Sequence, residues 1–190
     1  CALKVATTTI CGAGRKCGVG VGCGSKGALF AWLPHLTEEG MLLVCNGVKD
    51  RSMLSLILSS QRLGLNVIPV MEEYSEFESL LALADAQGVT PTLGVRVRLA
   101  TRGSGRWSES AGSRSKFGLS IPELMRLVAE LERRGKPESL ALLHFHIGSQ
   151  IIDIQVLKRA LKEMPQIYAA LHGRGVPVRY IDVGGGLGVS

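Results

Sequence analysis

Short apolar runs alternate with longer amphipathic segments along most of this chain, and this alternation constrains the fold more than any other feature. The longer segments carry apolar residues at helical spacing, whereas the short runs have the length of buried strands. Strands that alternate with helices predict a parallel sheet with both faces buried. Seven runs are candidate strands: 2–6, 17–22, 41–46, 66–71, 92–100, 140–147 and 178–183.

Two of the amphipathic segments carry helix-start signals. Residues 76–87 place apolar residues on one face, and Ser75 with Glu78 has the spacing of a capping box before them. Residues 121–134 show the same pattern, an apolar face that follows a capping residue, here Ser120. We therefore predict that these two helices begin directly after their serine residues.

A third helix is predicted from about Asp153 to His172. Pro165 lies inside it and should kink or split it, because proline lacks the N–H that the helix ladder needs. Gly135, Gly173 and Gly175 are expected to end helices.

The strand pattern leaves two architectures open, an open doubly wound sheet and a (β/α)8 barrel. Seven candidate strands are one fewer than a closed barrel needs. The length of 190 residues suits one domain, and no linker divides the chain. The segment 101–116 is a long loop rich in Gly, Ser and Arg, and is therefore a functional candidate.

Composition excludes several classes of protein. No apolar run reaches the roughly 18 residues of a membrane helix, so no membrane partner is expected. Five irregularly spaced cysteines argue against a disulfide framework or zinc site and favour a reducing compartment. Basic residues concentrate in 96–116, but Trp107 is the one aromatic residue before Phe117. This disfavours nucleic acid and favours a subunit contact or an anionic small ligand.

Unusual residues follow two of the predicted strands. The stretch "LLHFHIGSQI" at 142–151 places His144 and His146 on one face of its strand, followed by Gly148 and Ser149. The stretch "YIDVGGGLGV" at 180–189 ends its strand in the three glycines Gly184, Gly185 and Gly186. Consecutive bare amides can hold an anion, so both strand ends are candidates for a phosphate site. A hydrogen-bonded core histidine and a plain flexible turn are the alternatives.

Lys4, in "CALKVA", is the candidate attachment point for a cofactor. A lysine at the end of an interior strand is costly to bury in its charged form, so it can lose its proton and form a Schiff base with pyridoxal phosphate. A surface lysine near the chain end is the alternative that the pattern alone favours.

Several ordered motifs together resemble the pyridoxal phosphate-dependent biosynthetic arginine decarboxylases, within the wider family of ornithine, diaminopimelate and arginine decarboxylases. The resemblance covers the chain from about residue 24 onward. The matching stretches are "VCNGVKD" (44–50), "LGVRVRLATRGSGRW" (93–107), "SRSKFGLS" (113–120), "LLHFHIGSQI" (142–151) and "DVGGGLGV" (182–189). The resemblance implies a (β/α)8 barrel of the alanine racemase type followed by a β domain. It also implies the conversion of L-arginine to agmatine and carbon dioxide for polyamine synthesis.

The resemblance also implies roles for individual residues. His146 would stack on the cofactor ring, and Arg98 would line the site. Lys116 resembles a lysine that bridges to a second subunit. Lys4 would be the Schiff-base lysine, and the residues expected to hold the phosphate are Ser149, Gly184, Gly185 and Gly186. The implied cofactor is pyridoxal 5′-phosphate, with Mg²⁺ as an additional expectation for the parent enzyme. The implied partners are L-arginine and further copies of the same subunit.

Two departures from the family pattern stand in the first third of the chain. Gly22 replaces an acidic residue, and Ala28 replaces a glutamate that would complete a capping box with Ser25. We expect residues 1–190 to be a partial cofactor-binding barrel without its C-terminal β domain, inactive alone. The alternatives are a non-catalytic homologue that pairs with an active subunit, or another pyridoxal phosphate barrel such as a racemase or a cofactor carrier. The expected compartment is the cytoplasm, or the plastid in a plant or alga.

Overall fold

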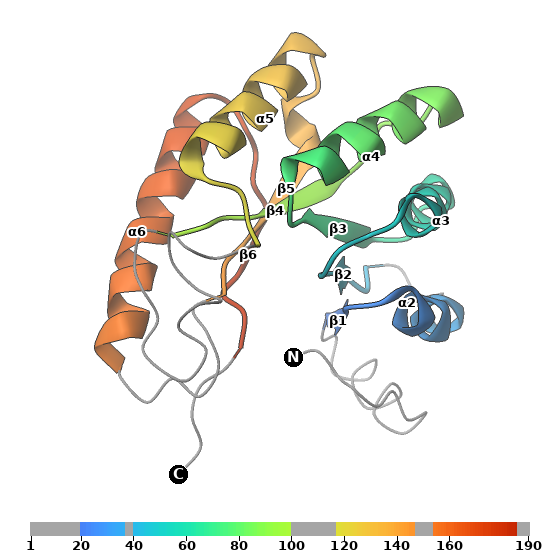
Figure 1. Ribbon diagram of the computed structural model, residues 1–190, viewed down its shortest axis with the longest axis horizontal. Coiled ribbons are helices and arrows are strands. Elements are labelled where there is room, and N and C mark those ends of the chain that lie inside the picture. The colour runs from blue at the N-terminus through green and yellow to red at the C-terminus, as the bar shows by residue number, and fades with distance from the viewer. Residues whose placement is uncertain (1–19, 37–39, 100–116, 147–153, 186–190) are drawn as a thin grey trace. The chain divides into compact units, whose positions relative to one another are not determined.

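The computed structural model describes residues 20–36, 40–99, 117–146 and 154–185, in which helices and strands alternate (Figure 1). Two compact units divide the chain. The first comprises Cys1–Met71 and Ser75–Leu93, and the second Glu72–Tyr74 and Gly94–Ser190. The elements in chain order are β1 (Val21–Cys23), α2 (Lys26–Trp32), the 3-10 helix η1 (Leu33–His35), β2 (Leu43–Cys45), α3 (Arg51–Arg62), β3 (Val67–Met71), α4 (Tyr74–Gln87), β4 (Leu93–Arg96), α5 (Ile121–Arg133), the 3-10 helix η3 (Pro137–Ser139), β5 (Leu140–His144), α6 (Ile154–Gly173) and β6 (Tyr180–Asp182).

The first unit is built on three parallel strands in the order β1-β2-β3. Their register pairs Val21 with Leu43 and Leu43 with Val67. Helices α2 and α3 lie on the same side of these strands (Figure 1). Together they bury an apolar core that includes Leu29, Trp32, Leu43, Ile57 and Val67. The predicted pattern of buried strands joined by helices is confirmed in this unit.

Side chains at the helix starts fix where α2 and α3 begin. Ser25 Oγ accepts a hydrogen bond from the Ala28 N–H at 3.2 Å, and Asp50 Oδ1 accepts one from the Met53 N–H at 2.7 Å. The first turn of α2 carries no acidic residue, so the Ser25 cap has no reciprocal partner. This confirms the expected loss of the capping box at Ala28.

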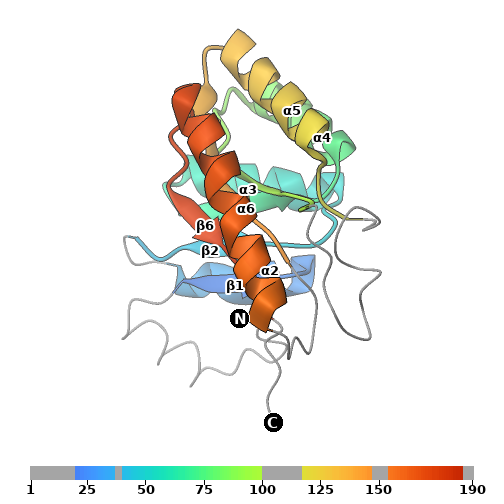
Figure 2. The same ribbon diagram turned by 90° about the vertical axis from the view of Figure 1, so that its left-hand side faces the viewer.

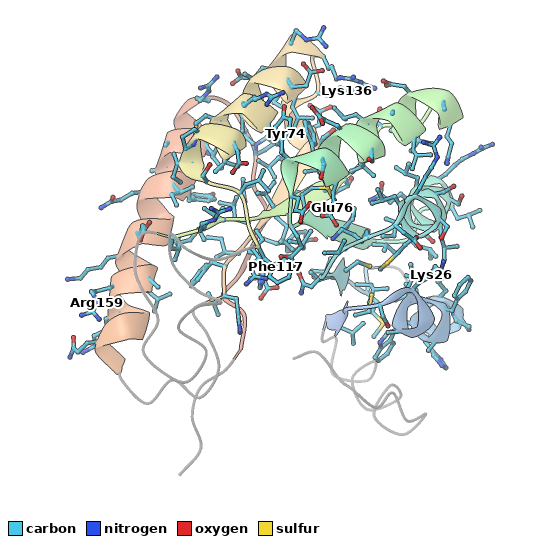
Figure 3. All side chains as sticks on the ribbon, viewed as in Figure 1. Lys26, Tyr74, Glu76, Phe117, Lys136 and Arg159 are labelled. Atoms are coloured by element: carbon cyan, nitrogen blue, oxygen red, sulfur yellow. The ribbon has the colours of Figure 1, made fainter. Side chains whose placement is uncertain are left out.

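A lysine is fully buried in the first unit. The side chain of Lys49 has no exposed surface, and its ammonium contacts the carbonyl oxygens of Gly47 and of Val70, the latter at 2.6 Å. Its Nζ also lies 3.4 Å from Oε2 of Glu76, near the start of α4 (Figure 3). Glu76 Oε1 accepts a hydrogen bond from the Lys49 backbone N–H at 2.7 Å. Several polar partners of this kind are needed to offset the cost of burying the charged ammonium.

The second unit contains β4, β5 and β6 with helices α5 and α6. Strands β5 and β6 are parallel, and their register pairs Leu142 with Tyr180 and His144 with Asp182. Gly94 of β4 lies so close to β5 that an added Cβ would be 2.8 Å from the Leu142 side chain. Arg174, after α6, donates to both carboxylate oxygens of Glu132 in α5, at 2.9 and 2.6 Å. Consecutive strands of this unit are therefore neighbours in the sheet, as in the predicted βα architecture.

The predicted start of α5 is confirmed. Ser120 and Glu123 form a reciprocal capping box, in which the Ser120 N–H and hydroxyl both contact Glu123 Oε2 at 2.7 Å. Gly135 and Gly175 follow α5 and α6 with φ of +68° and +77°, as expected of helix-ending glycines.

Two predictions about helices need correction. The helix α4 does not begin after Ser75, because it already starts at Tyr74 and includes Ser75. Pro165 does not split α6, which runs unbroken from Ile154 to Gly173 (Figure 2). The kink that was the alternative to a split stays a prediction. A buried apolar stripe spans both sides of the proline and holds them in one helix, and it consists of Ala160, Met164, Ile167 and Leu171.

Six of the expected strand regions fall at least partly among the described residues and contain a strand there. The run predicted at 17–22 corresponds to β1, which is shifted to Val21–Cys23. The run 92–100 contains β4, which ends at Arg96, and the next residue, Val97, forms an isolated bridge with Leu119. The candidate strand 2–6 and the loop 101–116 lie outside the described residues.

Candidate functional site

The carboxyl ends of β5 and β6 bring two of the predicted features together. His146 follows β5, and Gly184 and Gly185 follow β6. Gly184 has φ of +70°, and a Cβ placed on it would lie 2.8 Å from the Phe145 carbonyl oxygen and 2.9 Å from His146 Nδ1. Only glycine therefore lets the turn after β6 pack against the His146 ring. The sequence prediction that these residues share one site is consistent with this arrangement.

Asp182 fixes both strand ends. Its Oδ2 lies 3.0 Å from Nδ1 of the buried His144, and its Oδ1 accepts a hydrogen bond from the Gly184 N–H at 2.9 Å. Its backbone carbonyl accepts from the Phe145 N–H at 3.0 Å. One residue thus orients the glycine turn, the core histidine and the backbone that leads into His146.

The charge state of Asp182 follows from these contacts. Burial is the largest single influence and raises the pKa of its carboxyl. The contacts with His144 and with the Gly184 N–H lower this pKa, and together they outweigh burial. The net result is a pKa below the usual range, so Asp182 is ionised at neutral pH.

His146 is half-buried, and its environment keeps the ring neutral. Burial lowers the pKa of the imidazole most, and the positive charge of Arg96 and the proximity of His144 lower it further. A pKa below that of a free histidine leaves an uncharged ring at neutral pH. The neutral, flat imidazole ring of His146, just after the carboxyl end of β5, can pack against another aromatic ring.

A buried ion pair accompanies this ring. Arg96, at the end of β4, donates to Glu72 Oε2 at 2.9 Å, and Glu72 is almost fully buried. The Arg96 guanidinium also lies 5.8 Å from the ring centroid of Phe117, which Figure 3 labels. The Gly118 N–H donates to the Glu72 carbonyl at 2.9 Å. The Arg96 guanidinium, whose charge lowers the pKa of His146, is therefore held by the Glu72 carboxylate and the Phe117 ring.

Arg98 is described at the end of the same segment. Its Nε and Nη2 donate to the Gly118 carbonyl at 3.2 and 2.7 Å. The sequence prediction that Arg98 lines the site stays a prediction. Arg96 was not predicted, although its place two residues before Arg98 puts it on the same face of an extended chain.

Four other predicted positions lie outside the described residues. They are Lys4, Lys116, Ser149 and Gly186. Among the residues that sequence reasoning missed, Asp182 had a usable signal, since it is the one acid between an apolar strand and the glycine run.

Comparison with known proteins identifies the family. Residues 2–190 match the family described as pyridoxal-dependent decarboxylase, pyridoxal binding domain. The chain belongs to the pyridoxal-dependent decarboxylase family.

Related sequences in this family carry a common name. The chain is 49% identical over 177 residues to the biosynthetic arginine decarboxylase of Rhodopirellula baltica, covering 93% of this chain and 26% of that protein. It is 47% identical over 171 residues to the protein of the same name from Thermosynechococcus vestitus, covering 90% of this chain and 27% of that one. The chain thus spans about a quarter of the length of the curated relatives that it matches.

Solved structures of the pyridoxal-dependent decarboxylases show the same fold. The biosynthetic arginine decarboxylase of Campylobacter jejuni matches with a TM-score of 0.81 and 31% identity, covering 95% of this chain and 29% of that one. The diaminopimelate decarboxylase of Helicobacter pylori, complexed with L-lysine, matches with a TM-score of 0.80 and 24% identity, covering 96% and 45%. These matches confirm the α/β barrel-type fold predicted from the sequence.

The residues at the ends of β5 and β6 fit a pyridoxal-type cofactor. A neutral imidazole offers a ring face, and the absent side chain at Gly184 leaves the backbone close to it. Nothing lies within 4 Å of a Cβ built on Gly185, so the turn after β6 has free space at this residue. The donor set thus suits a phosphorylated aromatic group.

Proposed function

We propose that this protein decarboxylates L-arginine to agmatine and carbon dioxide, with pyridoxal 5′-phosphate as cofactor, in polyamine biosynthesis. One observation carries the proposal. Over 93% of its length the chain is 49% identical to a biosynthetic arginine decarboxylase, and the match includes the family's cofactor-binding domain. The contact between Gly184 and His146 supports it, because it joins two features that a phosphorylated aromatic cofactor needs.

In this proposal each site residue has a distinct task. The neutral ring of His146 packs against the cofactor ring and carries no competing charge. Gly184, Gly185 and Gly186, with Ser149, hold the phosphate, and Asp182, which accepts from the Gly184 N–H, holds the glycine turn in place. The bound cofactor supplies an electron-withdrawing ring that stabilises the charge left as carbon dioxide departs.

Two further positions complete the proposed site. Lys4 carries the covalent attachment of the cofactor, and Arg98 lines the substrate side. We also propose that the protein forms a homo-oligomer, to which Lys116 contributes.

The remaining expectations concern the surroundings of the protein. We propose a cytoplasmic location, or a plastid in a plant or alga, without nucleic acid or membrane partners. Within the described part of the chain, no helix is long and apolar enough to cross a membrane. Mg²⁺ in the parent enzyme stays a prediction. Within that same part, no group of three or more His, Cys, Asp and Glu side chains could hold a metal ion.

A second candidate function is a non-catalytic subunit, and one observation favours it. Gly22 stands in β1 where the family resemblance implies an acidic residue. A Cβ built there would meet only the Val44 carbonyl oxygen, at 3.8 Å, so there is room for a side chain. The glycine is therefore not imposed by packing.

A chimera tests the function. The matched 177 residues of the Rhodopirellula baltica enzyme are replaced by those of this chain, and agmatine and carbon dioxide are measured with arginine, ornithine or lysine as substrate. We expect agmatine from arginine, and the Gly22→Glu variant shows whether the missing acid limits the rate. Carbon dioxide from ornithine or lysine alone would refute the substrate. Cofactor binding without carbon dioxide from any substrate would favour the non-catalytic subunit.

A labelling experiment on the 190-residue chain tests the attachment site. The chain is incubated with pyridoxal 5′-phosphate, reduced with borohydride, digested with trypsin and mapped by mass spectrometry. We expect a dominant adduct on Lys4. Exposed Lys26, at the start of α2 (Figure 3), reports non-specific labelling. Equal labelling of Lys4 and Lys26 would contradict the assignment.

A further inference from the structure

Two cysteines face each other at the ends of the first two strands. Cys23 is the last residue of β1 and Cys45 the last residue of β2, and the parallel register pairs them directly. Their sulfur atoms are 3.3 Å apart. The two thiols are free and lie in the first unit, whereas His146, Gly184 and Gly185 belong to the second.

The backbone around the pair allows a covalent bond. Neighbouring strands lie about 4.8 Å apart, which falls within the roughly 4.4–6.8 Å between Cα atoms that disulfides span. The sulfur atoms already approach to 3.3 Å, and a disulfide needs about 2.0 Å, a change that small side-chain rotations can supply. We infer that Cys23 and Cys45 form a reversible disulfide, a redox modification site that links β1 to β2.

The surroundings give the two thiols unequal roles. The hydrogen bond with Cys45 lowers the pKa of Cys23, and although burial opposes this, the positive charge of Lys49 adds to it. The contact with Cys23 and burial raise the pKa of Cys45. Cys23 is therefore the more acidic of the two thiols and the nucleophile, and Cys45 is the resolving thiol.

The oxidant is a small peroxide. The Cys23 thiolate attacks one peroxide oxygen and becomes a sulfenic acid, while the second oxygen leaves and is protonated to water. The Cys45 sulfur then attacks the Cys23 sulfur, and the sulfenic oxygen leaves as a second water. Hydrogen peroxide is thus reduced to two waters as two thiols become one disulfide, and a dithiol reverses the change. Cys23 and Cys45 are 2% and 0% exposed, which favours a small uncharged oxidant over a bulky disulfide.

Peptide mapping of the full chain tests the inference. Trypsin leaves Cys23 in peptide 17–26 and Cys45 in peptide 27–49, but the first peptide also contains Cys17. The Cys17→Ser variant removes this ambiguity. The folded variant is treated with hydrogen peroxide, remaining thiols are alkylated in denaturant, and the digest is analysed without reduction.

The expected product is peptide 17–26 linked to peptide 27–49, which dithiothreitol separates. In the oxidised chain we expect a midpoint of thermal unfolding raised by roughly 5 °C. The matched control is Cys17→Ser with Cys45→Ser, in which a sulfenic-acid probe should label Cys23 and no linked peptide should form.

Two outcomes would overturn the inference. One is that both thiols remain fully alkylated after the native chain has been treated with peroxide. The other is that Cys23 links mainly to Cys1 or Cys11. Neither outcome depends on a variant of Cys23 or Cys45, nor on cofactor binding or decarboxylase activity, so this test is independent of the proposed function.

Discussion

Replacing Gly184 with alanine tests whether the turn after β6 depends on a missing side chain. The added Cβ would lie 2.8 Å from the Phe145 carbonyl oxygen, roughly 0.5 Å inside the usual C···O approach of about 3.3 Å. It would also lie 2.9 Å from His146 Nδ1. The Phe145 oxygen is backbone, and the Phe145 N–H is bonded to Asp182, so the strand end cannot move away without cost.

Two contributions set the size of the effect. A left-handed backbone conformation costs an alanine about 1–2 kcal/mol, and the steric conflict adds about 1–2 kcal/mol more. We therefore expect Gly184→Ala to lower the free energy of unfolding by about 2–4 kcal/mol. The loss should be local to the ends of β5 and β6.

The matched control is Gly185→Ala, one residue further along. A Cβ at Gly185 meets no atom within 4 Å, so its effect should stay within about 0.5 kcal/mol. Urea unfolding followed by circular dichroism gives the global effect, and hydrogen–deuterium exchange of peptides covering 140–146 and 178–185 gives the local one. If Gly184→Ala matched the unmodified chain in both measurements, or if Gly185→Ala were equally damaging, the reasoning would be refuted.

Three further predictions concern charges and a cap. Arg96→Met should raise the pKa of His146 toward its ordinary value, which an NMR titration would measure. It should also lower the free energy of unfolding by about 3 kcal/mol, because buried Glu72 loses its cation. An unchanged titration of His146 would contradict the role of Arg96. Since the pKa of Asp182 is lowered in the folded chain, its stabilising contribution is present above about pH 4 and is lost as the pH falls further. Asp182→Asn should therefore lose less stability between pH 7 and pH 3 than the unmodified chain, and an equal loss in urea midpoints would count against this. Ser120→Ala should lower the free energy of unfolding in urea by about 1 kcal/mol. Ser59 is an exposed serine inside α3, and Ser59→Ala should change this free energy by a few tenths of a kcal/mol at most.

The parts of the fold that depend on local chemistry could be predicted from the sequence. The capping box of Ser120 and Glu123 forms as expected, because its partners are three residues apart and need no distant contact. The predicted start of α4 after Ser75 had the same local logic, but the helix begins earlier, at Tyr74. Glu76, one residue after Ser75, is buried and bonded to Lys49, a contact between distant residues that no local pattern displays.

The candidate site divides in the same way. His146 and the glycine run are recognisable because buried strands rarely end in such residues. Asp182 and Arg96 were missed because their importance arises from distances across strands, to His144 and Glu72, that depend on register. Strand register cannot be read from alternating apolar residues alone.

The burial of Lys49 gives the chain an internal reporter of its own opening. An amine that contacts two carbonyl oxygens and a carboxylate, with no exposed surface, cannot meet an acylating reagent while the first unit stays closed. Its acylation rate, relative to that of exposed Lys26, therefore measures how often this unit opens under native conditions. A disulfide between β1 and β2 should slow the acylation of Lys49. The acylation rate of this one lysine would therefore report whether Cys23 and Cys45 are reduced or oxidised.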